Sequence, residues 1–155
     1  MVPGCLVGRS LEGALCRSWR PGPRHRFQDW PNDQVPKRAA GVYTVWDPDR
    51  LLYVGMSGRA MTAADLEVSP NGRVVAKGLW TRLNAHASGR RSGDQFCVYV
   101  ADRLVLPTLT SDDARQIAEG LMPLDRKVRS YIRERVSYRF VEVPDGTAEG
   151  QLRPS

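Results

Sequence analysis

Two tyrosines, one arginine and one histidine stand at spacings that could support phosphodiester chemistry. Tyr43 and Tyr53 lie in two short stretches of β-branched and aromatic residues, and Arg82 and His86 stand four positions apart in a later segment. A guanidinium is a fixed cation whose forked donors match phosphate oxygens. A phenol hydrogen-bonded to an imidazole can accept or relay a proton from water. Each such side chain taken singly more often serves packing or solvation, so the prediction depends on their meeting at one place.

A β-hairpin would position the two phenols. The segments 41–46 (GVYTVW) and 51–55 (LLYVG) flank DPDR at 47–50, which is a turn by composition. This pattern is typical of a hairpin. If the connecting loop has an odd number of residues, Tyr43 and Tyr53 point to the same face of the sheet.

A helix would position the arginine and the histidine. The apolar residues of segment 77–88 (KGLWTRLNAHAS) recur at helical spacing, and Gly89 follows as a plausible C-cap. Arg82 and His86 would then be neighbours at the edge of the contact between helix and sheet. We therefore expect the four side chains to share one half-buried concavity.

The remaining segments predict further elements from their periodicity and residue types. They are an irregular loop over 56–76 with a helical turn at 62–67, a strand over 95–101, a helix from the N-cap Ser111 to Pro123, a helix over 124–135 and a strand over 138–143. The fold class expected is α/β (α+β), with a small antiparallel sheet flanked by helices over residues 37–144. Residues 145–155 are expected to be a frayed tail.

The first 36 residues form a separate region by composition. Residues 1–36 hold five of the eleven prolines and show no sustained periodicity, which predicts an irregular N-terminal tail rich in proline and arginine. The tail either wraps onto the domain through Trp19, Phe27 or Trp30, contacts a partner, or has no role.

Positive charge is concentrated in blocks. The formal net charge is +6, which favours a polyanionic partner. In the helix expected over 124–135, arginines would lie on the face opposite the apolar one. The candidate nucleic-acid-binding residues are the basic side chains Lys77, Arg90, Arg91, Arg126, Arg129 and Arg133.

Composition excludes several other classes. The 155 residues, 41% hydrophobic and 26% charged, suit one globular domain rather than a disordered, collagen-like or coiled-coil chain. No apolar run approaches the ~20 residues of a membrane span, and the N-terminus does not resemble a secretory signal, so we expect a cytoplasmic protein. Three cysteines do not make a disulfide framework or a zinc knuckle. Walker, GxGxxG, GxSxG and HExxH motifs are absent.

Three motifs together resemble a known family. GVY at 41–43, YVG at 53–55 and LWTRLNAH at 79–86 are similar to the motifs of the GIY-YIG nuclease superfamily, and the RLxxH helix is similar to its restriction-endonuclease branch. The resemblance implies a GIY-YIG-like fold in which Gly41 and Gly55 are structural, allowing close strand packing and a turn into the loop.

The resemblance also implies roles for the four side chains. Tyr43 would activate or position the attacking water, with His86 as its hydrogen-bond partner. Tyr53 and Arg82 would hold the scissile phosphate and stabilise its developing charge. The catalytic residues expected are therefore Tyr43, Tyr53, Arg82 and His86.

The metal site is where the sequence departs from the family. The resemblance implies a divalent metal, normally Mg²⁺, held by a Glu on a helix after the third core strand. If 138–143 is that strand, the helix should come after Asp145-Gly146, where Glu149 is the sole carboxylate, and its neighbours Gly150 and Pro154 do not suit a helix. The metal ligand stays unknown, and the chain is either truncated relative to its relatives or a copy that cuts poorly.

The sequence thus predicts Mg²⁺-dependent endonuclease-type hydrolysis of phosphodiester bonds in DNA. The partner would be nucleic acid, with no membrane and no cofactor beyond a divalent metal. One alternative is a catalytically impaired relative that only binds nucleic acid. Another is a small basic domain whose helix over 124–135 docks an acidic protein.

Overall fold

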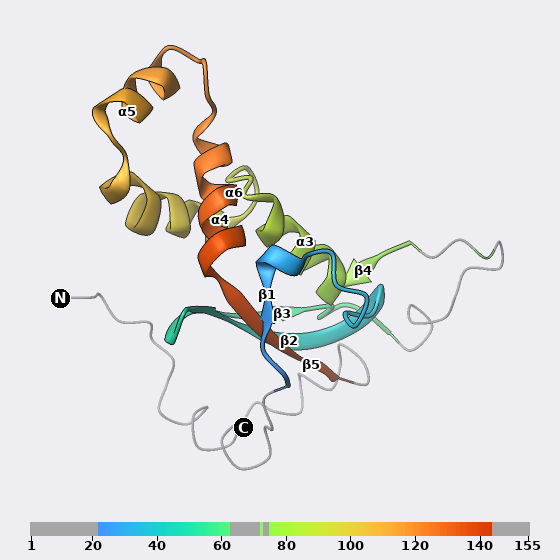
Figure 1. Cartoon of the computed structure of the whole chain (residues 1–155). Helices are drawn as coiled ribbons and strands as arrows, with labels where there is room; N and C mark the ends of the chain where they lie inside the picture. The colour runs from blue at the N-terminus through green and yellow to red at the C-terminus, as the bar shows by residue number, and fades with distance from the viewer. Residues whose placement is uncertain (1–21, 63–71, 73–74, 144–155) are drawn as a thin grey trace, which may run out of the picture.

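A computed structural model describes residues 22–62, 72 and 75–143 of the chain, and Figure 1 shows their arrangement. The strands are β1 (His25–Arg26), β2 (Arg38–Asp47), β3 (Arg50–Ser57), β4 (Lys77–Gly78) and β5 (Ser137–Val143). The helices are the 3-10 turn η1 (Phe27–Asp29), α3 (Leu79–Ser88), α4 (Gln95–Val100), the π-helical η2 (Ala101–Val105), the 3-10 turn η3 (Leu106–Thr108), α5 (Ser111–Ala118) and α6 (Leu124–Arg135). The expected α+β class is confirmed.

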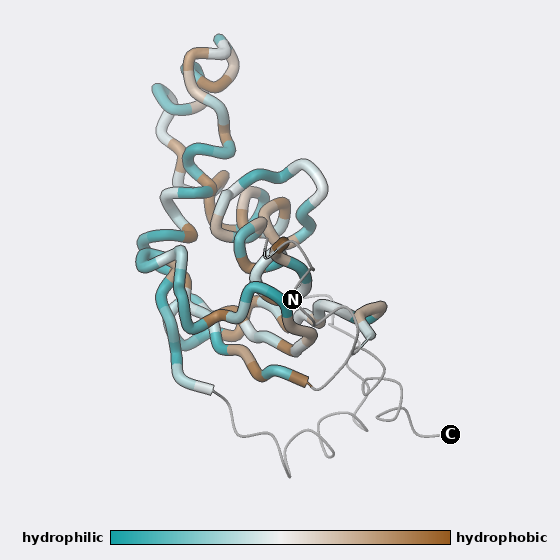
Figure 2. The backbone as a smooth tube through the Cα atoms, turned by 90° about the vertical axis from the view of Figure 1, so that its right-hand side faces the viewer, coloured by the Kyte–Doolittle hydropathy of each residue, from teal (hydrophilic) through white to brown (hydrophobic). Residues whose placement is uncertain are grey.

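The sheet places the GVY strand at its centre. Four strands in the order β1-β5-β2-β3 pair with their neighbours in antiparallel orientation. The short β4 pairs with β2 in parallel. The helices α3, α4 and α6 lie on one side of this sheet, and α5 projects away from it (Figure 1). In the side view of Figure 2, hydrophilic and hydrophobic residues alternate along that projection, and α5 has no buried residue.

One hydrophobic core lies between the sheet and the helices. Tyr43 and Val45 of β2 belong to the same buried cluster as Leu79 and Leu83 of α3 and Ile132 of α6. Full burial of a leucine or isoleucine side chain stabilises the folded state by about 1.5–3 kcal/mol relative to exposure. The core therefore fixes α3 against the face of the sheet that carries Tyr43.

The predicted hairpin is confirmed, but a β-bulge replaces the predicted odd loop. A two-residue turn connects the strands, and the pairing of Trp46 with Leu51 shifts at the next position to Val45 with Tyr53. Leu52 is thus an extra residue on β3, and an extra residue changes the alternation of faces by one. As a result, Tyr43 and Tyr53 point to the same face.

The predicted strand over 95–101 is wrong, because this segment is helical. It forms α4 and runs on into η2. The Asp94 side chain caps α4 by accepting hydrogen bonds from the backbone N–H groups of Phe96 and Cys97 at 3.0 and 3.4 Å. The β-forming residues of α4 face the core at helical spacing, with Phe96, Cys97 and Val100 buried. Capping and packing therefore outweigh the β-propensity of the segment.

The helix predicted from Ser111 has a different N-cap. Thr110 is the N-cap of α5, and its side chain and that of Asp113 form a reciprocal capping box. The helix over 124–135 is confirmed as α6, and the strand over 138–143 is confirmed as β5 with one more residue at its start. The helix predicted over 77–88 begins two residues later, because Lys77 and Gly78 form β4.

Part of the proline- and arginine-rich segment packs into the domain. Phe27 and Trp30 are buried in the core, and the backbone N–H of Phe27 donates to the carbonyl of Val136 at 3.1 Å. The sequence left three alternatives for residues 1–36, and the structure shows that the described part of this region wraps onto the domain through Phe27 and Trp30. Trp19, the tail over 145–155 and all but the first residue of the turn expected at 62–67 lie outside the described residues.

Within the residues that the structure covers, no helix has the length and apolar character needed to cross a membrane. The cytoplasmic location stays a prediction.

Candidate active site

The two motif glycines make room for neighbouring side chains. A Cβ atom on Gly55 would overlap Cζ and Oη of Tyr43, so the absence of a side chain at this position lets the phenol lie across β3. A Cβ on Gly41 would stand 2.6 Å from Cδ1 of Leu79 and would also overlap the carbonyl of Val141. Gly41 therefore allows the start of α3 to approach β2 closely, and Gly55 allows Tyr43 to reach α3.

A buried hydrogen-bonded chain joins β2 to α3 and α4. Tyr43 Oη lies 2.8 Å from Nε2 of His86, and Nδ1 of His86 lies 2.6 Å from Oδ2 of Asp94. Tyr43 and His86 are each 1% exposed, and Asp94 is 4% exposed. Because an ionised carboxylate only accepts, Nδ1–H of His86 donates to Asp94, and this leaves Nε2 facing the hydroxyl of Tyr43.

Asp94 is the functional candidate that sequence reasoning missed. Burial by itself would raise the pKa of Asp94, but the hydrogen bond and charge of His86 and the backbone N–H groups of Cys97 and Phe96 outweigh it, so the pKa is lowered. The carboxylate is therefore ionised at neutral pH. Its signal in the sequence is an Asp directly before a helix, and the β-forming residues of the segment that follows hide this signal.

The phenol of Tyr43 is held in its protonated form. Burial raises its pKa, as do the neighbouring phenol of Tyr53 and the carboxylate of Asp94, while the positive charge of Arg82 opposes them. At neutral pH Tyr43 is thus suited to relay a proton rather than to act as a standing phenolate. The effect of Arg82 also shows that its charge lies close enough to act on Tyr43.

Tyr53 lies at the edge of the cluster. Its half-buried ring is 6.1 Å from the ring of Tyr43 and 5.8 Å from that of His86, measured between centroids, and it also packs on Phe96 at 5.6 Å. The structure therefore brings Tyr43, Tyr53 and His86 together, and it does so through the bulge at Leu52 rather than through the predicted odd loop.

Arg82 faces solvent one helical turn before His86. Its exposed side chain lines a groove of about 410 Å³ between the end of β3 and the start of α3, together with Arg59 and Lys77. No acidic side chain of the described residues lines this groove, and Arg82 has no hydrogen bond or ion pair within them. None of the three aromatic rings lines it either. The four predicted side chains are thus neighbours, but they do not share one pocket.

The six predicted nucleic-acid-binding residues divide into four groups. Lys77 lines the Arg82 groove, while Arg90, Arg129 and Arg133 line a second hollow beyond it. Arg91 is paired with Asp125 at 2.6 Å. Arg126 is exposed on α6 and lines neither the Arg82 groove nor this second hollow.

The prediction that Arg133 lies on an open face of α6 is wrong. Its half-buried guanidinium donates to the backbone carbonyls of Ala87, Phe27 and Trp30 at 3.2, 3.2 and 2.7 Å. These carbonyls belong to the end of α3 and to the N-terminal segment, so Arg133 ties both to α6. The helical wheel missed this because it contains only the residues of one helix.

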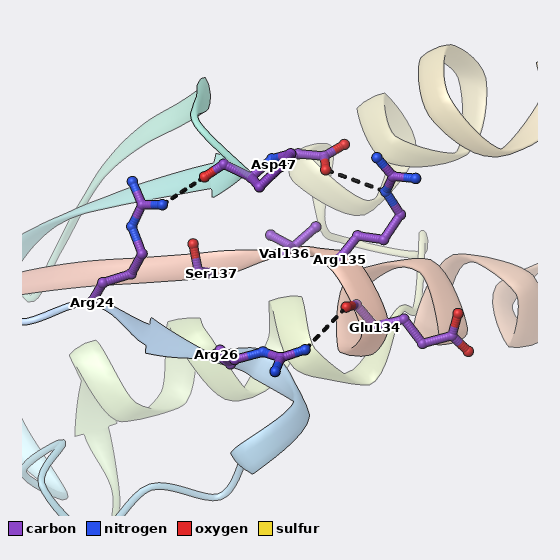
Figure 3. A pocket seen from close by; sticks show the side chains of 8 residues that line it. Arg24, Arg26, Asp47, Glu134, Arg135, Val136 and Ser137 are labelled. Carbon is purple, nitrogen blue, oxygen red and sulfur yellow. Dashed lines mark hydrogen bonds and ion pairs between the residues drawn. The ribbon is translucent and has the colours of Figure 1, made fainter.

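A third hollow lies at the other end of the sheet, and Figure 3 shows its arginines engaged by neighbouring groups. Arg24 donates to the carbonyl of Pro48 at 2.7 Å, Arg135 pairs with Asp47 at 3.3 Å, and Arg26 donates to a carbonyl of α6. These contacts fasten the hairpin turn to the end of α6. We assign them a structural role.

The described residues do not fit the expected magnesium ion. They contain no group of three or more His, Cys, Asp and Glu side chains that could hold a metal. Asp94, the carboxylate within the cluster, has both oxygens engaged by His86 and by backbone N–H groups. Glu149 lies outside the described residues.

No family model, curated protein or solved structure matches the chain. The resemblance to GIY-YIG nucleases therefore stays a prediction, and function has to be inferred from the geometry of the site.

Proposed function

We propose that the protein hydrolyses phosphodiester bonds in DNA as an endonuclease of the GIY-YIG kind. The observation that carries the proposal is the buried chain Tyr43–His86–Asp94 beside Arg82, whose side chain has no ion pair within the described part of the chain. A purely structural core has little use for such a set, because burying three polar groups stabilises a fold less than apolar packing of the same volume. Perturbed titratable groups that converge at one place are typical of catalytic sites.

The chain can take up the proton of an attacking water. The water would give a proton to Oη of Tyr43 as the tyrosine passes its own proton to Nε2 of His86, and the carboxylate of Asp94 would stabilise the imidazolium that forms. As the water oxygen bonds to phosphorus, the bond from phosphorus to the leaving sugar oxygen breaks. The leaving oxygen takes a proton from solvent, and His86 afterwards releases its proton to solvent. Tyr43 remains neutral throughout, in keeping with its raised pKa. Because Tyr43 is almost fully buried, the water would have to reach its oxygen past the half-buried ring of Tyr53.

Phosphate would be held from the groove side. Arg82 offers forked donors and a full positive charge to the non-bridging oxygens of the scissile phosphate, where negative charge grows in the transition state. Tyr53 would orient the same phosphate from the edge of the Tyr43–His86 cluster. Since the described residues offer Mg²⁺ no ligand set, no step is assigned to a metal.

A plasmid-nicking assay tests the proposal. Supercoiled DNA is incubated in Mg²⁺ with wild type, Tyr43→Phe and Arg82→Ala, and we expect each variant to lose about 100-fold or more in rate. Tyr99→Phe and Arg103→Ala, the latter at an exposed position of η2, are matched controls that remove the same groups outside the cluster, and they should cut like wild type. If wild type cuts no faster than Tyr43→Phe, the proposal is wrong.

A second candidate is a domain that binds DNA without cutting it. The lack of a free carboxylate in the cluster, among the described residues, favours it. It predicts salt-dependent DNA affinity in wild type together with no nicking at any Mg²⁺ concentration.

A further inference from the structure

A second basic hollow lies on the other side of α3 from the Arg82 groove. It has a volume of about 470 Å³ and a largely polar lining that includes Arg90, Arg129 and Arg133 together with Ser88 and Ser92. Asp94 also lines it, but both carboxylate oxygens of Asp94 are already engaged by His86 and by backbone N–H groups. Among the residues that the structure describes, the lining of the hollow therefore presents three positive charges and no available carboxylate.

Gly89 sets the position of Arg129 relative to α3. Gly89 has a φ of +70°, and a Cβ atom on it would stand 2.6 Å from Cα of Arg129. Only a residue without a side chain allows the helix to end here and the α6 backbone to come this close. The next residue along the chain is Arg90, so the close approach brings Arg90 and Arg129 to the same hollow.

Arg133 is held in place before any ligand arrives. Its three hydrogen bonds to carbonyls use Nε and Nη1, and Nη2 has no partner among the described residues. Arg129 likewise has no hydrogen bond or ion pair among them. Burial lowers the pKa of Arg133, and the nearby charge of Arg129 lowers it further. Two like charges held together without a counter-ion favour binding of an anion between them.

Ala85 connects this hollow to the Arg82 groove. It is the residue of α3 that lines both of them. Because its side chain is a single methyl group, the ridge between the two hollows is low, and an extended polyanion could lie across it.

We propose that a DNA strand crosses α3 over Ala85, with one backbone phosphate at Arg82 and another in the hollow formed by Arg90, Arg129 and Arg133. The inference rests on the proposed function in taking DNA as the ligand. It adds the direction in which the strand leaves the site. The contacts are to phosphate, so they position the strand without reading its sequence.

The test is DNA affinity measured in EDTA, where no metal-dependent cutting occurs. Fluorescence anisotropy of a labelled DNA duplex is recorded over a series of KCl concentrations. We expect Arg129→Ala and Arg90→Ala each to weaken binding about three- to tenfold and to reduce the slope of log affinity against log salt by about one. Arg126→Ala removes the same charge from the same helix outside the hollow, and it should change neither quantity by as much.

Two substitutions on the ridge test the path. Ala85→Glu places a carboxylate between the two phosphates and should weaken binding more than tenfold, whereas Ala85→Gln has the same size without the charge and should weaken it less. The inference is overturned if Ala85→Glu binds like wild type, or if Arg126→Ala costs as much as Arg129→Ala. It is also overturned if polyglutamate displaces the duplex at equal charge concentration, because the hollow would then suit an acidic protein equally well.

The two proposals fail separately. Loss of affinity in Arg129→Ala without any nicking by wild type would support the path and contradict the nuclease. Nicking that depends on Tyr43, with unchanged affinity in Arg129→Ala and Ala85→Glu, would support the nuclease and contradict the path.

Discussion

Asp94 connects helix capping to the candidate chemistry. One carboxylate oxygen caps α4, and the other lies 2.6 Å from Nδ1 of His86. The same residue thus fixes where α4 begins and which nitrogen of His86 faces Tyr43. A change at Asp94 should therefore affect both stability and cleavage.

We expect Asp94→Asn to lower the free energy of unfolding by about 1–3 kcal/mol near neutral pH, because a buried partner of His86 loses its charge. The pKa of Asp94 is lower in the folded state than its ordinary value of 3.8. As pH falls below that value, the unfolded chain takes up the proton first, so this part of the stability is lost in acid. Urea unfolding at a series of pH values should show a shallower acid loss for Asp94→Asn than for wild type.

Asp102→Asn provides the control for this experiment. Asp102 is an exposed acid of η2, so its amide variant should keep the acid dependence of wild type. An Asp94→Asn variant with the same acid dependence as wild type would contradict the expected charge on Asp94.

The hydroxyl of Tyr43 should govern stability in alkali. Its pKa is raised above the ordinary 10.0 by burial first, so above that pH the unfolded phenol ionises while the folded one keeps its proton. Stability should therefore fall as pH rises above about 10. Tyr43→Phe should be less stable near neutral pH by about 1–3 kcal/mol, because Nε2 of His86 loses its partner, but its alkaline loss should be shallower. Thermal unfolding at neutral and alkaline pH measures the stability of each variant and its loss in alkali. Tyr99→Phe, the control, should lose stability in alkali as steeply as wild type.

Helical spacing was enough to place Arg82 and His86 one turn apart on α3, because it is a property of the backbone. Strand alternation alone was not enough to bring Tyr53 beside Tyr43, since the two-residue turn would place them on opposite faces without the bulge. The bulge at Leu52 could not be predicted, because it depends on how the whole hairpin is accommodated against its neighbours.

Asp94 and Arg133 were missed for a different reason. Each makes its decisive contacts with residues of other elements: Asp94 with His86 of α3, and Arg133 with carbonyls of α3 and of the N-terminal segment. Residue type and periodicity describe one element at a time. They therefore predict which residues share one face of a helix, but not which groups of other elements pack on that face.

Gly55 should be intolerant of even one methyl group. Because a Cβ there would overlap Cζ and Oη of Tyr43, we expect Gly55→Ala to displace the phenol from His86 and to cost about 1–3 kcal/mol of stability. Nicking should fall with the loss of this hydrogen bond. Val54→Ala, at the exposed neighbouring position, should change neither stability nor nicking by as much. Equal behaviour of the two variants would show that Tyr43 does not need the space over Gly55.

The start of α5 offers a test of which residue caps it. Thr110 accepts from the backbone N–H of Asp113 at 3.1 Å, and the Asp113 side chain accepts from the backbone N–H of Thr110 at 3.1 Å. Since α5 has no buried residue, capping should account for much of its local stability. We expect Thr110→Ala to weaken the helix by about 0.5–2 kcal/mol, seen as faster amide hydrogen exchange in α5 with little change in global unfolding. Ser111→Ala lies inside the helix and should leave exchange nearly unchanged. Faster exchange in Ser111→Ala than in Thr110→Ala would instead favour the cap that the sequence pattern predicts.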